Sequence, residues 1–443
     1  MRGPLLALSF VSLSLAWLVF FGAGVRPTDW NAALLFLGAT ALFYWTFRSG
    51  QTPPHLPTWH AVALWALPGY AFFQLLPLPP PILESLSPAR QMLTETVGGV
   101  IPNLTHAPLS LAPGAATSGL FSLLGCLTVF SLIRDIKWRF VERRPWLTVA
   151  PLGVIAALEA FIGVGQWLSG PANTPVRGTL SSGEQFISLL EIALPLTLVY
   201  GFICFRRHQT QTTPSAMPAA HAATSWLAAL LILLALFHSN PQGSRVVVSG
   251  SLLVLLSLAL VPRLKTKKLR WYGAGAAAAF AIVALLVTAP PADFVESLAQ
   301  IGATEKTPAE TRLAVWSNSA VLLSEFRWFG TGIGGFEPAF LKYQGSSDLS
   351  SVSNPRNDAV ALFAAWGIVG GLIALLAVAG VFRPAIMGAL FLLDEPRRLL
   401  AATVIASLTA ALLRGGIGSF FCAPFLAMSF AWLAGVSQSC GLE

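Results

Sequence analysis

The chain has 443 residues, of which 55% are hydrophobic and only 10% are charged, with a formal net charge of +8. Soluble domains carry about 25% charged residues, so this composition excludes a soluble protein and predicts an all-α polytopic integral membrane protein. In such a protein, excess Lys and Arg report orientation in the membrane before they indicate nucleic acid. We therefore expect membrane lipids, and no nucleic acid, among the partners of the chain.

Twelve apolar runs predict about 12 transmembrane helices, because each spanning helix needs about 20 mostly apolar residues. In chain order they lie at 5–24, 31–47, 59–76, 116–133, 147–168, 185–204, 225–240, 246–262, 272–290, 358–381, 398–413 and 418–436. The first run follows a charged start, as in a signal peptide, but the many later spans favour an uncleaved helix. Pro241 and Gly243 separate the seventh run from the eighth. Residues 1–443 are thus expected to form a single transmembrane domain.

Basic residues are distributed unequally among the loops. Four alternate loops hold fifteen Lys and Arg residues, whereas the short loops between them hold four. Cytoplasmic loops carry the excess of Lys and Arg, so both termini are expected to be cytoplasmic. The long segments 77–115 and 291–357 are then both external loops.

The two external loops differ in pattern. Residues 77–115 are rich in proline and have no helical period. Residues 291–357 form the longest hydrophilic stretch, and "AETRLAVWSNSAVLLSEFRWFG" within it has apolar residues close to a helical stripe. Such a stripe predicts a helix that lies against the membrane surface.

The cysteine and histidine patterns indicate no metal site and no cofactor. The four cysteines form no CxxC pair, and the six histidines show no HExxH spacing. "GTGIGGF" at 330–336 has two readings, a backbone nest for an anion or a turn that permits a close helix crossing.

Five arginines are expected on the external face. Arg177, Arg245, Arg356 and Arg414 lie near the ends of spans, and Arg312 lies in the external helix. Arginine presents a fixed fork of donors that suits phosphate oxygens, so several of them could hold a pyrophosphate at the membrane surface. The alternative is that each extends to lipid head groups as an anchor.

Four stretches of the chain resemble the O-antigen ligase and O-antigen polymerase superfamily of bacterial membrane glycosyltransferases. They are "QLLPLPPPILESLSP" with "APLSLAPGAAT", "VRGTLSSGEQFISLLEIALPL", "SNPQGSRVVVSGSL", and "RLAVWSNSAVLLSEFRWFGTGIGGFEPAFLKYQ" leading into "RNDAVALFAAWGIVGG". The resemblance extends over roughly residues 74–436, about four-fifths of the chain.

The resemblance implies a metal-independent enzyme of the bacterial inner membrane that takes a glycan from undecaprenyl pyrophosphate on the periplasmic face. A ligase passes the glycan to lipid A core, and a polymerase passes one repeat chain to another. Arg177, Arg245 and Arg312 match positions at which the family holds the pyrophosphate. Asn357 also matches the family and is expected to bind substrate.

The chain differs from the family at Arg356, where the family usually has the histidine that serves as base for the acceptor hydroxyl. Arginine cannot act as a base near neutral pH, although it can stabilise a departing pyrophosphate. We therefore expect Arg356 and Asp358 to be catalytic. Candidates for the base are Asp358, Glu184, Glu337 and His238. Asp358 could instead face its own helix dipole, and His238 could be an interfacial histidine.

Two other functional classes remain open. A transporter or flippase would place charges inside the bundle at mid-depth, and Glu191 in the sixth span is the one clear intramembrane acid. A member of the family without catalytic activity could serve as a partner in polysaccharide assembly, in view of the missing histidine.

Overall fold

The computed structural model describes residues 2–21, 27–48, 53–98, 106–140, 144–170, 176–210, 216–239, 241–260, 309–343 and 352–440. These residues are almost entirely helical, and no strand occurs among them. The chain is an all-α polytopic membrane protein, as its composition predicts. The predicted ninth span, 272–290, lies outside the described residues.

Eleven helices occupy the other predicted spans. They are α1 (Arg2–Phe20), α2 (Pro27–Phe47), α3 (Thr58–Phe73), α6 (Pro113–Phe140), α7 (Ala150–Ser169), α8 (Gly183–Thr210), α9 (Ala216–Ser239), α10 (Pro241–Leu260), α15 (Asp358–Phe391), α16 (Glu395–Ile417) and α17 (Pro424–Ser437). Nine of these described helices are long and apolar enough to cross a membrane, whereas α3 and α17 have 16 and 14 residues. The break between α9 and α10 falls at the predicted place.

Four further helices lie outside the spans. α13 (Ala309–Glu325) is the helix predicted from its apolar stripe, and α14 (Phe336–Phe340) follows it. α4 (Pro80–Leu86) and α5 (Pro88–Gly98) correct the expectation that 77–115 has no helical content. Each of these two helices begins with proline, whose fixed φ suits the first turn and whose missing N–H is not needed there.

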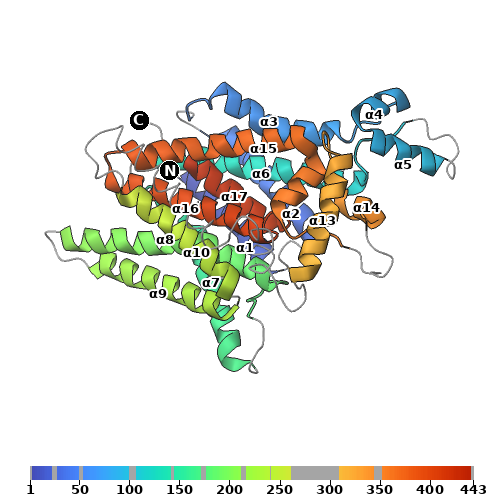
Figure 1. Cartoon of the computed structure of the whole chain (residues 1–443). Helices are drawn as coiled ribbons and strands as arrows, with labels where there is room; N and C mark the ends of the chain where they lie inside the picture. Colours follow the sequence, from blue (N-terminus) through green and yellow to red (C-terminus); the bar gives the residue numbers. More distant parts are fainter. Residues whose placement is uncertain are drawn as a thin grey trace.

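The centre of the bundle is formed by α8 and α16. Most of each helix is buried, whereas the other candidate spans bury a much smaller share of their residues. α8 packs against α7, α9 and α16, which Figure 1 shows around it. Small residues line the buried face of α16, including Ala401, Ala406, Ala410 and Ala411. In a membrane such residues allow helices to approach closely and gain van der Waals contact.

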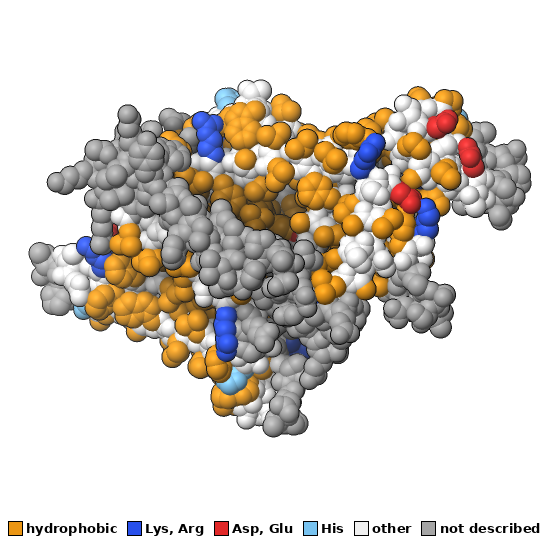
Figure 2. Space-filling model, in the orientation of Figure 1, with side chains coloured by type: hydrophobic (Ala, Val, Ile, Leu, Met, Phe, Trp, Pro, Cys, Tyr) orange, Lys and Arg blue, Asp and Glu red, His pale blue; other side chains and the backbone are white. Residues whose placement is uncertain are grey.

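The outer surface of the bundle is apolar. Figure 2 shows hydrophobic side chains over most of one face and around a hollow below α15. The most prominent acidic side chains on this face lie at the end that carries α4, α5, α13 and α14. A hydrophobic surface of this kind suits contact with lipid, which is as apolar as the side chains themselves.

The helix α15 is broken at Gly367, where the backbone has φ 62° and ψ −166°. A side chain at this position would collide with the backbone of Trp328, since a Cβ would lie 2.4 Å from the Trp328 carbonyl oxygen. The break frees carbonyl groups of α15, and in a membrane these must find donors within the protein. Tyr70 Oη donates to Trp366 O at 2.8 Å, and Gln74 Nε2 donates to Ala365 O at 3.0 Å.

The glycine-rich segment 330–336 supplies the remaining donors to the break. Thr331 N and Gly332 N donate to Ala364 O and Ala365 O at 2.8 and 2.9 Å. A Cβ on Gly330 would lie 2.4 Å from Ala365 O. The segment is therefore a close crossing against α15, and the amides of Thr331 and Gly332 are used in that crossing.

The basic loops within the described part of the chain meet at one end of the bundle, called the basic end below. Arg206 Nη1 at the end of α8 lies 2.5 Å from Glu395 Oε1 at the start of α16. Trp146 Nε1, just before α7, donates to Pro396 O at 3.1 Å. Both chain termini lie at the left in Figure 1, and α4, α5, α13 and α14 lie at the right. The termini therefore share one side of the bundle.

Candidate functional site

Four helix ends meet around one short segment at the end opposite the basic loops. α8 and α15 begin there, α16 ends there, and segment 418–421 follows α16. The α10 helix also begins nearby, because Ser244 Oγ lies 3.5 Å from Arg414 Nη2 in the last turn of α16. This site end contains Arg356, Asn357 and Asp358.

The segment 353–358 enters α15 through a strained turn. Arg356 has φ 52°, which is unusual for a residue with a side chain. Asn354 Oδ1 stabilises the turn by accepting from Arg356 N at 2.7 Å. Asn357 caps the helix by accepting from the N–H groups of Ala359 and Val360, and its Nδ2 donates to Gly416 O at 2.9 Å. The turn holds the Arg356 side chain partly exposed.

The α13 helix holds this turn from the side. Arg312 is buried, and its Nη2 donates to Arg356 O at 3.1 Å and to Ile417 O. Trp316 lies one turn further along, stacks under the Arg312 guanidinium and donates from Nε1 to Pro355 O at 2.8 Å. Burial lowers the pKa of Arg312, while the charge of Glu184 opposes that shift. The Arg312 guanidinium thus contacts the backbone of the turn directly.

Two carboxylates accept from three successive amides of segment 418–421. Glu184 Oε1, in the first turn of α8, accepts from Ser419 N at 2.8 Å. Asp358 Oδ2 accepts from Phe420 N at 2.8 Å and Phe421 N at 3.0 Å. Asp358 therefore faces this segment, and Asn357 performs the capping of α15. Asp358 stays in the first turn of α15, where the helix dipole favours a carboxylate, and it also contacts a different part of the chain.

Arg356 and Glu184 form a loose and accessible pair. Arg356 Nη1 lies 3.8 Å from Glu184 Oε2, with side-chain exposures of 44% and 29%. At this distance the pair is an ion pair without a direct hydrogen bond. Both groups therefore retain polar atoms that can contact a bound substrate.

Arg177 lies on a turn that α7 anchors. Gln166 Oε1 accepts from Gly178 N at 3.0 Å, and Glu159 accepts from both the N–H and the hydroxyl of Thr179 at 3.0 and 2.5 Å. The Arg177 side chain is exposed. Arg245 is also exposed, at the start of α10. Glu159 is fully buried, so Glu191 is not the one intramembrane acid that the sequence indicates.

Arg414 lies in the last turn of α16 at the site end, but its side chain points into the bundle. It is buried, and it donates from Nε to Glu191 Oε2 at 2.8 Å and from Nη2 to Glu191 Oε1. The two-pronged pair occupies the guanidinium fork, so Arg414 is not available to a pyrophosphate. His238 stacks on Trp167 at 3.9 Å between ring centroids, in keeping with an interfacial histidine.

Sequence reasoning did not find Asn354 or Ser419 as part of the site. Ser419 Oγ donates to Asn354 Oδ1 at 3.1 Å, and Asn354 Nδ2 contacts Cys422 Sγ at 2.6 Å. Asn354 lies two residues before Arg356, so its position in the turn was a usable signal. Segment 418–421 has no such signal in the sequence, because backbone amides make its contacts with Glu184 and Asp358.

Part of this site lies in a region that is similar to a known protein family. Residues 227–375 match a family model described as O-antigen ligase. This match over residues 227–375 supports a relationship to the O-antigen ligase and polymerase superfamily. No curated protein matches the chain.

The O-antigen ligase match contains α13, the turn around Arg356 and the broken part of α15. Glu184 and segment 418–421 lie outside the matched range but contact residues within it. The family resemblance inferred from the sequence is confirmed over residues 227–375. This O-antigen ligase-type chain is a multi-pass membrane protein with a ligase or polymerase type of role in polysaccharide assembly.

Proposed function

We propose that this chain transfers a glycan from undecaprenyl pyrophosphate to an acceptor hydroxyl on the periplasmic face of the bacterial inner membrane. The acceptor is lipid A core in a ligase, and another glycan chain in a polymerase. The observation that carries the proposal is the accessible pair of Arg356 and Glu184, 3.8 Å apart, at the entrance of the O-antigen ligase region.

Exposed guanidinium groups at the site end would bind the donor. Arg177 and Arg245 are exposed and Arg356 is partly exposed, and a guanidinium fork fits pyrophosphate oxygens. Arg312 donates to the Arg356 carbonyl, so we assign it the role of positioning Arg356. Asn357 would support substrate binding by fixing the start of α15.

Glu184 is the best-placed base. One Asp358 oxygen already accepts two amide hydrogen bonds, whereas Glu184 accepts one and has a partly exposed side chain beside Arg356. In the proposed step, the acceptor oxygen bonds to the anomeric carbon while the bond from that carbon to the pyrophosphate oxygen breaks. The acceptor proton passes to Glu184, and the arginines stabilise the charge that develops on the leaving undecaprenyl pyrophosphate. Asp358 holds segment 418–421 in place.

The test is a transfer assay on the purified full chain with a lipid-pyrophosphate glycan and an acceptor glycan or lipid A core. Wild type should form product, and Arg356→Ala, Arg177→Ala and Arg245→Ala should each reduce it strongly. Arg327→Ala is the matched control, because Arg327 lies beyond α13 and is exposed. Wild-type protein that binds the donor but forms no product would overturn transfer and support a non-catalytic partner.

A transporter is less well supported. The buried Arg414 and Glu191 pair lies in the last turn of α16 and two turns into α8. Charges that guide a substrate across the membrane are expected near mid-depth. The pair is closed on itself by two hydrogen bonds, so it does not provide an open binding group.

A further inference from the structure

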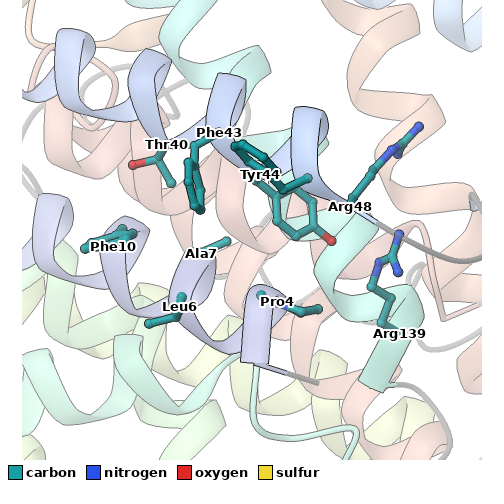
Figure 3. A pocket seen from close by; sticks show the side chains of 11 residues that line it. Pro4, Leu6, Ala7, Phe10, Thr40, Phe43, Tyr44, Arg48 and Arg139 are labelled. Carbon is teal, nitrogen blue, oxygen red and sulfur yellow. The ribbon is translucent and has the colours of Figure 1, made fainter.

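A second candidate binding site, with an apolar lining and a polar end, lies at the basic end. Its residues are far in sequence from those proposed for glycan transfer. A pocket of about 180 Å³ opens between α1 and α2. Its lining is mostly apolar, with Tyr44 and two arginines, Arg48 and Arg139, at one end. Figure 3 shows both arginines on the side of the pocket toward which the Tyr44 hydroxyl points.

The walls of the pocket face outward, and its floor is buried. Leu6, Phe43 and Phe47 are 51%, 56% and 71% exposed, whereas Ala7 and Tyr44 are almost fully buried. The pocket is therefore a groove between two spanning helices that is open toward the lipid. Pockets that enclose a small molecule measure about 300–1,000 Å³, so this groove suits part of one chain rather than a whole ligand.

The polar end of the groove carries a net positive charge. Asp135 lies behind it and accepts from Tyr44 Oη at 2.5 Å, while Arg48 Nη1 and Arg139 Nε each lie 3.3 Å from its carboxylate. One carboxylate thus holds two guanidinium groups in place and neutralises one charge. Arg48 is 31% exposed and uses Nη1 on Asp135, so further donors of its fork can face an anion.

We propose that this groove binds one anionic phospholipid of the surrounding leaflet. A segment of one acyl chain lies between Leu6, Phe10 and Phe43, and the head-group phosphate contacts Arg48 and Arg139. Charge complementarity selects the anionic lipid, since basic residues near a membrane surface attract anionic head groups. The proposal is independent of glycan transfer, because it concerns different helices and the opposite end of the bundle.

The test compares two lipids that share their acyl chains. Native mass spectrometry of the purified full chain would measure binding of dioleoyl phosphatidylglycerol and dioleoyl phosphatidylcholine. The anionic lipid should bind about fivefold more tightly, the effect of roughly one interfacial charge. Arg48→Gln should remove this preference, and Arg48→Lys should keep most of it.

Two further variants make the result decisive. Arg383→Gln removes the same charge from an exposed position on α15 and should leave the preference unchanged. Leu6→Trp fills the mouth of the groove and should weaken binding of both lipids, with no change in melting temperature in detergent alone. Equal binding of the two lipids, an equal loss in Arg383→Gln, or no effect of Leu6→Trp would each overturn the proposal.

Discussion

Two arginine and glutamate pairs on α8 are built differently. Glu191 and Arg414 are both buried and joined by two hydrogen bonds. Glu184, two turns earlier on the same helix, lies 3.8 Å from Arg356, with both side chains exposed by more than a quarter. The inner pair has its donors and acceptors matched to each other, whereas the outer pair leaves room for a third group. The buried pair of Glu191 and Arg414 therefore suits a structural role, and the accessible pair of Glu184 and Arg356 suits contact with a substrate.

The inner pair should show the largest effect when broken. Glu191→Ala leaves the Arg414 charge buried without its partner, which costs about 3–5 kcal/mol. We expect a large fall in melting temperature or loss of the protein from the membrane, measured by thermal unfolding in detergent. The double variant Glu191→Leu with Arg414→Met removes both charges and should recover much of the stability. A single variant that melts like wild type would show that the pair is not structural.

The outer pair should show its effect in catalysis. Glu184→Gln keeps an acceptor for Ser419 N but cannot take up a proton, so kcat should fall about 10²–10⁴-fold. The melting temperature should stay close to that of wild type. Glu337→Gln is the control, since Glu337 is an acid of the long loop 291–357 and was also a candidate base. If both variants lost activity to the same degree, Glu184 would have no special role.

Variants of Arg177 test whether the fork of guanidinium donors contributes to donor binding at the site end. Arg177→Ala should raise the KM for the lipid-linked donor about tenfold, the size expected for one charge-assisted contact. Arg177→Lys keeps the charge without the fork and should restore part of the affinity. Steady-state kinetics at varied donor concentration would measure both. A change in kcat with an unchanged KM would argue against a binding role.

The turn at Arg356 gives the smallest expected effect. Arg356→Gly and Arg356→Ala both remove the guanidinium and should lose transfer equally. Only glycine adopts φ near 52° without strain, so the glycine variant should be more stable by about 1 kcal/mol. Chemical denaturation of the two purified variants would measure the difference. Equal stability would mean that the turn changes its backbone when the arginine is removed.

The sequence predicted the fold well where apolar length alone decides it. Eleven predicted spans have helices, and the predicted break between the seventh and eighth spans occurs, although α10 begins at Pro241 and not at residue 246. The sequence missed the helices in 77–115, because seven and eleven residues are too few to show a clear period beside several prolines. It also missed the burial of Glu159, whose partner Thr179 lies twenty residues away on a turn.

The site was predicted in part. Arg356, Asn357 and Asp358 do lie at the start of a long apolar helix, and α13 does form beside them. The partners of Glu184 and Asp358 are backbone amides of residues 419–421, and a backbone amide leaves no mark on the sequence. Arg414 is buried and paired because α8 places Glu191 beside it. Neither of these facts follows from spacing along the chain.

The broken helix α15 has a mechanical consequence. Segments from α3, from the glycine-rich stretch and from residues 327–328 all fasten to α15 within a few residues of Gly367. This joint therefore fixes the position of the outer part of the molecule, which includes α13 and the Arg356 turn. A bulky residue at Gly367 would push against Trp328 and tilt that assembly as a unit. The orientation of the site therefore depends on the small size of Gly367.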